Sequence, residues 1–149
     1  MSRLLWINGP KLGRLGQRKP ELYGTRSLEQ IVSDVRSLAE PLGIEIVHAQ
    51  ADDEALLVEA VARDSARCDG IVCNPASLTP SGLALRQALD DSGLPVAIVH
   101  LTNVAVRRDW SERDIFMDVA RIYVAGAGWV GYQLAVLAFD ALLQGRIPR

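Results

Sequence analysis

The sequence predicts an α/β fold in which helices cover both faces of a parallel β-sheet, built as one domain over residues 1–149. Short apolar runs alternate with helical apolar stripes along the whole chain, and five such β–α units imply right-handed crossover connections between parallel strands. The length is typical of one domain. We find no internal repeat, low-complexity tract or linker that would divide the chain.

The expected strands are short apolar runs that end at turn or polar residues. They cover residues 4–7, 44–48, 70–73, 95–99 and 122–125. Helices are expected from a capping box at Ser27 to Gln30 up to Gly43, from about Asp53, over about 81–90 with Ser81 as N-cap, and over 130–143. Residues 11–26 contain several glycines and basic residues without an apolar period, which predicts a long loop of functional importance.

Composition excludes several classes of protein. The 16 basic and 18 acidic residues nearly cancel, so no basic surface for nucleic acid or an anionic membrane is expected. No apolar run approaches the roughly 20 residues of a spanning helix, and the N-terminus lacks the apolar core of a signal peptide, so we expect a cytoplasmic protein. Cys68 and Cys73 match no metal or redox spacing and are expected to be reduced and structural.

Polar side chains follow the predicted strands where the strands end. They are Asn8, Asn74, His100, Thr102 and Asn103. In a parallel α/β sheet, ligands bind beyond the carboxyl ends of the strands, at the point where the strand order reverses. The sequence therefore predicts a ligand site at this edge of the sheet.

The loop segment from Arg18 to Gly24 contains a candidate general base. Tyr23 would act as a base only in its ionised form, which a nearby positive charge such as that of Arg18 would favour. The alternative is a solvated basic loop with a packed tyrosine.

The segment from His100 to Asn103 contains a candidate general acid. His100 would donate a proton, and the backbone N–H groups after it would hold a carboxylate. The alternative is a structural histidine near a strand end. Asn74 is a candidate to clamp a carboxylate or carbonyl group, whereas residues 75–81 also read as an ordinary turn before a helix.

Residues 126–131 fit the glycine fingerprint of dinucleotide sites. This fingerprint falls in the last β–α unit, with no later strand to supply the acidic partner of the ribose. Close packing of the final helix against the sheet explains the glycines more simply, and we expect no nicotinamide cofactor.

Five motifs together resemble the type II 3-dehydroquinate dehydratase (type II dehydroquinase) family, in order and at the family's spacing. They lie in residues 8–16 (NGPKLGRLG), 18–24 (RKPELYG), 74–86, 99–103 (VHLTN) and 126–132 (GAGWVGY). The resemblance runs along nearly the whole chain. It implies a flavodoxin-like three-layer sandwich with strand order 2-1-3-4-5, no cofactor or metal, and a trimer-based homo-oligomer, typically a dodecamer.

The resemblance also implies a reaction: trans elimination of water from 3-dehydroquinate through an enolate, giving 3-dehydroshikimate in the shikimate pathway. Tyr23 would remove the proton α to the ketone, Arg18 would keep Tyr23 ionised, and His100 would protonate the departing hydroxyl. Asn74, Thr102 and the backbone N–H groups of Leu101 and Thr102 would grip the substrate carboxylate, and residues 11–26 would form a lid.

This chain departs from the family's pattern at five positions that the family uses for binding or orientation. An asparagine is replaced by Lys11, a histidine by Pro80, an aspartate that reaches a neighbouring subunit by Gln87, a glutamate that orients the catalytic histidine by Ile98, and an arginine by Ser111. Lys11 would stabilise the enolate, form a Schiff base with the ketone, or point to solvent.

Because the residues of the chemical step remain while those that read distal hydroxyls are replaced, three hypotheses stay open. The chain dehydrates 3-dehydroquinate, it acts on a related carboxylic acid as a lyase of secondary metabolism, or it is an inactive ligand-binding homologue. Gln87 and Trp110 fall where subunits of the family meet, so the assembly of this protein is also open.

Overall fold

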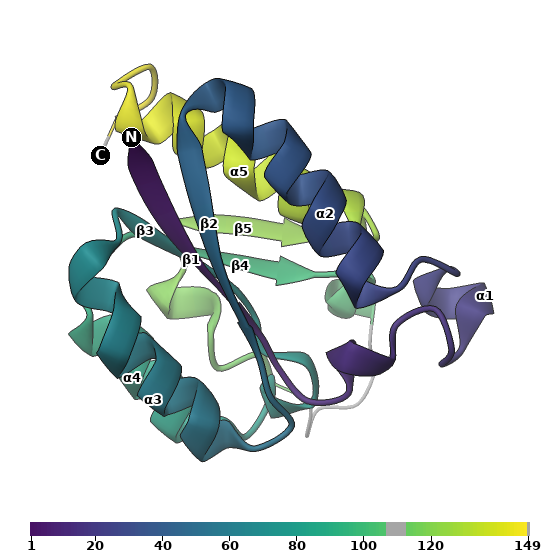
Figure 1. The fold of residues 1–149 in the computed structure, drawn as a ribbon. Coiled ribbons are helices and arrows are strands. Elements are labelled where there is room, and N and C mark those ends of the chain that lie inside the picture. The colour runs from purple at the N-terminus through teal and green to yellow at the C-terminus, as the bar shows by residue number, and fades with distance from the viewer. Residues whose placement is uncertain (107–112, 149) are drawn as a thin grey trace.

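The computed structural model describes residues 1–106 and 113–148. Its sheet contains five parallel strands in the order β2-β1-β3-β4-β5. The strands are β1 (Ser2–Asn8), β2 (Ile44–Gln50), β3 (Gly70–Asn74), β4 (Val96–His100) and β5 (Ile122–Ala125). Helices cover both faces of the sheet (Figure 1). The predicted fold class and strand order are confirmed.

The helices are α1 (Pro20–Tyr23), α2 (Leu28–Ala39), α3 (Glu54–Asp64), α4 (Leu83–Asp91) and α5 (Val130–Leu143). The capping box at Ser27 is confirmed: its hydroxyl accepts from Gln30 N, and the Gln30 side chain accepts from Ser27 N. The predicted N-cap at Ser81 is wrong, because Ser81 N donates to Leu78 O inside a turn and Gly82 caps α4 instead.

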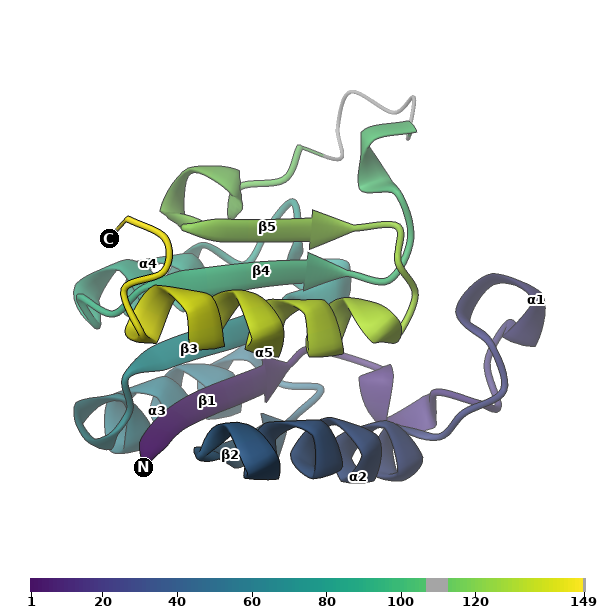
Figure 2. The same ribbon diagram turned by 90° about the horizontal axis from the view of Figure 1, so that it is seen from above.

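The predicted loop over residues 11–26 is not free of secondary structure. It contains one 3-10 turn at Leu12–Arg14 and the single helical turn α1, which begins at Pro20. Proline favours the first turn of a helix, because the N–H it lacks would have no partner within the helix. The segment still leaves the sheet–helix layers, and α1 projects beyond the carboxyl ends of the strands (Figure 2).

Two apolar cores lie on opposite faces of the sheet. One packs α2 and α5 against side chains such as Trp6 and Val99, and the other packs α3 and α4 against Ile7 and Ile98. A Cβ at Gly131 in α5 would lie 3.1 Å from Val99 Cγ1, tighter than ordinary contact. The predicted packing role of the glycine segment before α5 is confirmed at this position.

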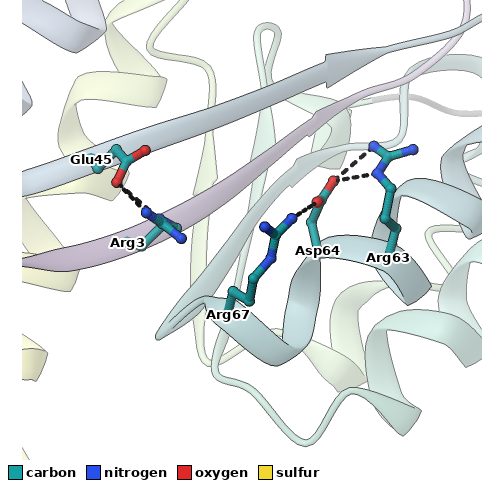
Figure 3. A network of polar contacts seen from close by, with 5 residues as sticks. All are labelled: Arg3, Glu45, Arg63, Asp64 and Arg67. Carbon is teal, nitrogen blue, oxygen red and sulfur yellow. Dashed lines mark hydrogen bonds and ion pairs between the residues drawn. The ribbon is translucent and has the colours of Figure 1, made fainter.

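Ion pairs lie near the amino ends of the strands (Figure 3). Arg3 of β1 donates two hydrogen bonds to the side chain of Glu45, the residue paired with it on β2. Asp64 ends α3, where a carboxylate opposes the helix dipole, and hydrogen bonds from Arg63 and Arg67 hold its pKa below the ordinary value. These pairs lie at the edge of the sheet opposite the predicted ligand site.

Both cysteines are free thiols, as predicted. Cys73 is fully buried in β3, and burial raises the pKa of its thiol. In the described part of the chain, no helix combines the length and apolar character needed to cross a bilayer.

Candidate active site

A cavity of about 270 Å³ opens at the carboxyl end of the sheet, between the segment 11–26 and the ends of β3 and β4. Of the predicted site residues, it brings together Lys11, Arg18, Tyr23, Asn74, Pro80, His100, Leu101 and Thr102. Segments far apart in the sequence therefore meet where parallel strands place a ligand site.

Other predicted positions do not line this cavity. Asn8 is fully buried in a hydrogen-bond chain behind it, and Asn103 is exposed with its side chain accepting from Ala105 N. Gln87 lies on the exposed face of α4 and donates to Asp91. Ser111 and Trp110 fall outside the described residues.

His100 is the last residue of β4, and its side chain is only 5% exposed. Its Nε2 lies 2.7 Å from Asp114 Oδ2. Because an ionised carboxylate only accepts hydrogen bonds, Nε2 must carry a proton, and the other ring nitrogen, Nδ1, is left for proton exchange with a ligand.

Asp114 receives two more hydrogen bonds. Tyr123 Oη donates to Oδ2 at 2.6 Å and Phe116 N donates to Oδ1 at 2.8 Å. Burial opposes ionisation of Asp114, but the hydrogen bonds from His100, Tyr123 and Phe116 outweigh it, so the pKa of this carboxyl is lowered. Burial and the same carboxylate raise the pKa of Tyr123, which therefore remains a donor.

Asn74 is fixed by a directed chain of hydrogen bonds. Its Oδ1 accepts from Ala76 N at 3.0 Å, so its Nδ2 donates to Tyr132 Oη at 2.8 Å. Tyr132 Oη donates in turn to Asn8 Oδ1 at 2.8 Å, and Asn8 Nδ2 lies 3.0 Å from His48 Nε2. The order of donors makes His48 an acceptor at Nε2 and fixes the amide of Asn74 in one orientation.

Lys11 adopts the left-handed backbone conformation, with φ of 65°. Its N–H donates to Asp52 Oδ1 at 2.8 Å, which together with Gln50 lowers the pKa of Asp52. The preceding turn lies directly against β3: a Cβ at Gly9 would come within 2.4 Å of Pro75 O. Only glycine permits this approach, which places Lys11 beside the end of β3 at the cavity.

Tyr23 ends α1 and is half-buried against the core beneath α2 and α5, whereas Arg18 is exposed. Both line the same cavity as His100. The end of this segment is attached to the domain by Arg26, which forms an ion pair with Asp34 and lies 5.0 Å from the ring of Trp129.

Two further residues contribute to this region and were not predicted. Thr79 is buried, lines the cavity and donates from Oγ1 to Ala76 O at 2.6 Å. Asp114 contacts His100 from behind the cavity. The sequence signal for Asp114 is weak, since it is one acidic residue in a polar segment 14 positions after the histidine.

Comparison with known proteins identifies the family of this chain. The family model described as dehydroquinase class II matches residues 2–140. The chain is 39% identical over 142 residues to a 3-dehydroquinate dehydratase of Pseudoalteromonas translucida, covering 95% of each chain, and 39% identical over 145 residues to one of Vibrio cholerae, covering 97% of each. Its fold is similar to the crystal structure of type II dehydroquinase from Propionibacterium acnes, with a TM-score of 0.89 and 28% identity over 95% of this chain and 98% of that one.

An α/β fold with candidate acid and base residues around one cavity is typical of an enzyme that transfers protons. The chain belongs to the class II dehydroquinase family.

Proposed function

We propose that this protein is a hydro-lyase that dehydrates 3-dehydroquinate to 3-dehydroshikimate without a cofactor, as a cytoplasmic enzyme of the shikimate pathway. The observation that carries the proposal is the meeting of Tyr23, Arg18, His100 and Asn74 at one cavity in a chain of this family. The similar proteins of Pseudoalteromonas and Vibrio are named 3-dehydroquinate dehydratases, which supports this reaction and this substrate.

In the proposed mechanism, the phenolate of Tyr23 removes the proton α to the ketone and an enolate forms. Arg18 lines the same cavity, and the family resemblance implies that it keeps Tyr23 ionised. His100 then protonates the departing hydroxyl group, which leaves as water. Asn74, Thr102 and the backbone N–H groups of Leu101 and Thr102 hold the carboxylate, and the segment 11–26 restricts access of water.

The position of Lys11 supports a further role. Its backbone places it at the cavity beside the end of β3, and its side chain carries a full positive charge, which would stabilise an enolate oxygen there. We propose that Lys11 stabilises the enolate by charge, in place of the amide that the family carries at this position.

A second candidate substrate is a related cyclic hydroxy-keto acid with different ring substituents. Pro80 lines the cavity at the position where the family carries a histidine, and proline has neither a side-chain polar group nor a backbone N–H. A site that no longer hydrogen-bonds a hydroxyl group loses much of its preference for substrates that carry one.

An absorbance assay for the conjugated enone product tests both candidates. With 3-dehydroquinate, we expect turnover that falls at least about 100-fold in Y23F, because the variant lacks the proton acceptor. K19A, on the same segment but outside the cavity lining, is the control. Wild-type turnover only with a related acid would favour the second candidate, and unchanged turnover in Y23F would refute the assignment of the base.

We further propose that the protein assembles as a trimer-based homo-oligomer, up to a dodecamer, as the family resemblance implies. Gln87 would then lie toward a neighbouring subunit's site, since it does not reach the cavity of its own chain. Light scattering of the purified protein would give its molar mass, and a monomer would overturn this proposal.

A further inference from the structure

His100 has a carboxylate partner on the side away from the candidate active-site cavity. Asp114 does not line that cavity and instead lines an adjacent hollow with Arg86, Arg113 and Asp118. The side chains of His100 and Asp114 are 5% and 6% exposed, and His100 Nε2 lies 2.7 Å from Asp114 Oδ2. A contact this short and this buried restricts the rotation of the imidazole ring.

The strand that carries His100 offers no acidic partner of its own. Ile98, two residues earlier and thus on the same face of β4, is fully buried in the core with Ile7 and Phe116. The carboxylate comes instead from the segment that leads to β5. The histidine is therefore held by a residue that reaches it through tertiary structure.

The position of Asp114 is itself fixed from several elements. Phe116 N and Tyr123 Oη donate to its two oxygens. Ile115 N donates to Thr79 O at 3.0 Å, which attaches this segment to the turn between β3 and α4. The rings of His100 and Tyr123 also lie close, with centroids 5.6 Å apart. A carboxylate held by three donors cannot turn away from the imidazole without breaking them.

We infer that Asp114 is the positioning residue of His100: it holds the proton on Nε2, so that Nδ1 faces the cavity and delivers the proton to the departing hydroxyl group. This inference rests on the proposed function. The proton on Nδ1 of the imidazolium passes to the hydroxyl oxygen as the carbon–oxygen bond breaks, and water leaves. The imidazole that remains is neutral and keeps its proton on Nε2, which donates to Asp114.

NMR of the imidazole nitrogens tests the inference without any activity. The chain has two histidines, so long-range proton–nitrogen spectra give two ring systems, which H48Q assigns. We expect a proton on Nε2 in the neutral form of His100 and a proton on Nδ1 in His48, whose Nε2 accepts from Asn8. In D114N the His100 signal should shift toward the other tautomer while His48 stays unchanged. An unchanged His100 tautomer in D114N would overturn the inference even if the enzyme is active.

Kinetics of the same variant provide the second test. D114N should lower kcat about 10- to 100-fold with a much smaller change in KM, because the imidazole is bound in place less firmly while the groups that hold the substrate are unchanged. D114E should recover part of the loss. D118N is the matched control, since it removes an exposed carboxylate from the same segment. With a purely structural Asp114, D114N would not lower kcat selectively and D114E would not recover it, and failure of the wild type to turn over would refute only the proposed function.

Discussion

Single residues at the carboxyl edge of the sheet carry most of the proposed chemistry, and the sequence identified them unevenly. Asn74 and His100 could be predicted because each ends a strand, and strand ends are visible in the sequence. Asp114 could not, because its role depends on its contacts with Tyr123 and His100, which only the folded chain creates. Asn8 also ends a strand at the predicted site, but it is buried behind the cavity and is linked to Asn74 through Tyr132.

At the residue scale, the backbone of Ala76 leads to a prediction about stability. Ala76 has φ of 52°, a conformation that disfavours a side chain and that the Asn74 turn requires. A76G should therefore raise the free energy of unfolding by up to about 1 kcal/mol. Urea denaturation would measure it.

The matched control is A62G, the same substitution on the exposed face of α3. There it should lower the free energy of unfolding by about 1 kcal/mol, because glycine disfavours a helix interior. Destabilisation by both substitutions would show that the turn after β3 does not disfavour alanine.

At the scale of elements, the helices and strands were largely predictable because their apolar periods and end signals are strong. The bounds of β5 and α5 agree with those expected, and the capping box at Ser27 is present. The start of α4 was misplaced because Ser81 and Gly82 both resemble caps, and the choice between them depends on the turn formed by Leu78. Within residues 11–26, α1 is a single turn and too short to show a period.

The capping box predicts the effect of removing one hydroxyl group. S27A should cost about 1 kcal/mol of unfolding free energy, since Gln30 N at the start of α2 loses its acceptor. S33A, on the exposed face of the same helix, should change it by less than about 0.5 kcal/mol. Thermal unfolding of the two variants checks the difference, and equal values would contradict a specific role for the cap.

At the scale of the whole molecule, the sequence was sufficient for the layers and the strand order but not for the polar chain that crosses the sheet. That chain joins β1, β2, β3 and α5 through His48, Asn8, Tyr132 and Asn74. Its members are separated by up to 124 positions, and no local pattern connects them. This row of hydrogen bonds holds His48 in its neutral form in a largely buried position.

This histidine predicts how stability depends on pH. Burial, assisted by the charge of Arg36, lowers the pKa of His48 to about 4, against about 6.5 in an unfolded chain. Between these values the unfolded state binds a proton that the folded state does not, so the free energy of unfolding should fall as pH falls from 6.5 to 4, by up to about 3 kcal/mol. The carboxyl groups with lowered pKa values, such as Asp64, lose their contributions only at lower pH.

Urea denaturation at pH 7 and pH 4.5 measures the effect. H48Q is the control, because a glutamine oxygen also accepts from Asn8 Nδ2 and does not titrate. The wild type should lose more stability between the two pH values than H48Q does. Equal losses would assign the pH dependence to other groups.

The two groups proposed to exchange protons with the substrate differ in how firmly the fold supports them. The phenol of Tyr23 belongs to an outlying segment held at its far end by Arg26, whereas the imidazole of His100 ends a buried strand. A fluctuation that swings the outlying segment would separate the base from the substrate while leaving the acid in place. Proton abstraction is therefore the step of the proposed reaction that local motion disturbs most, and catalytic activity can be lost while the domain is still folded.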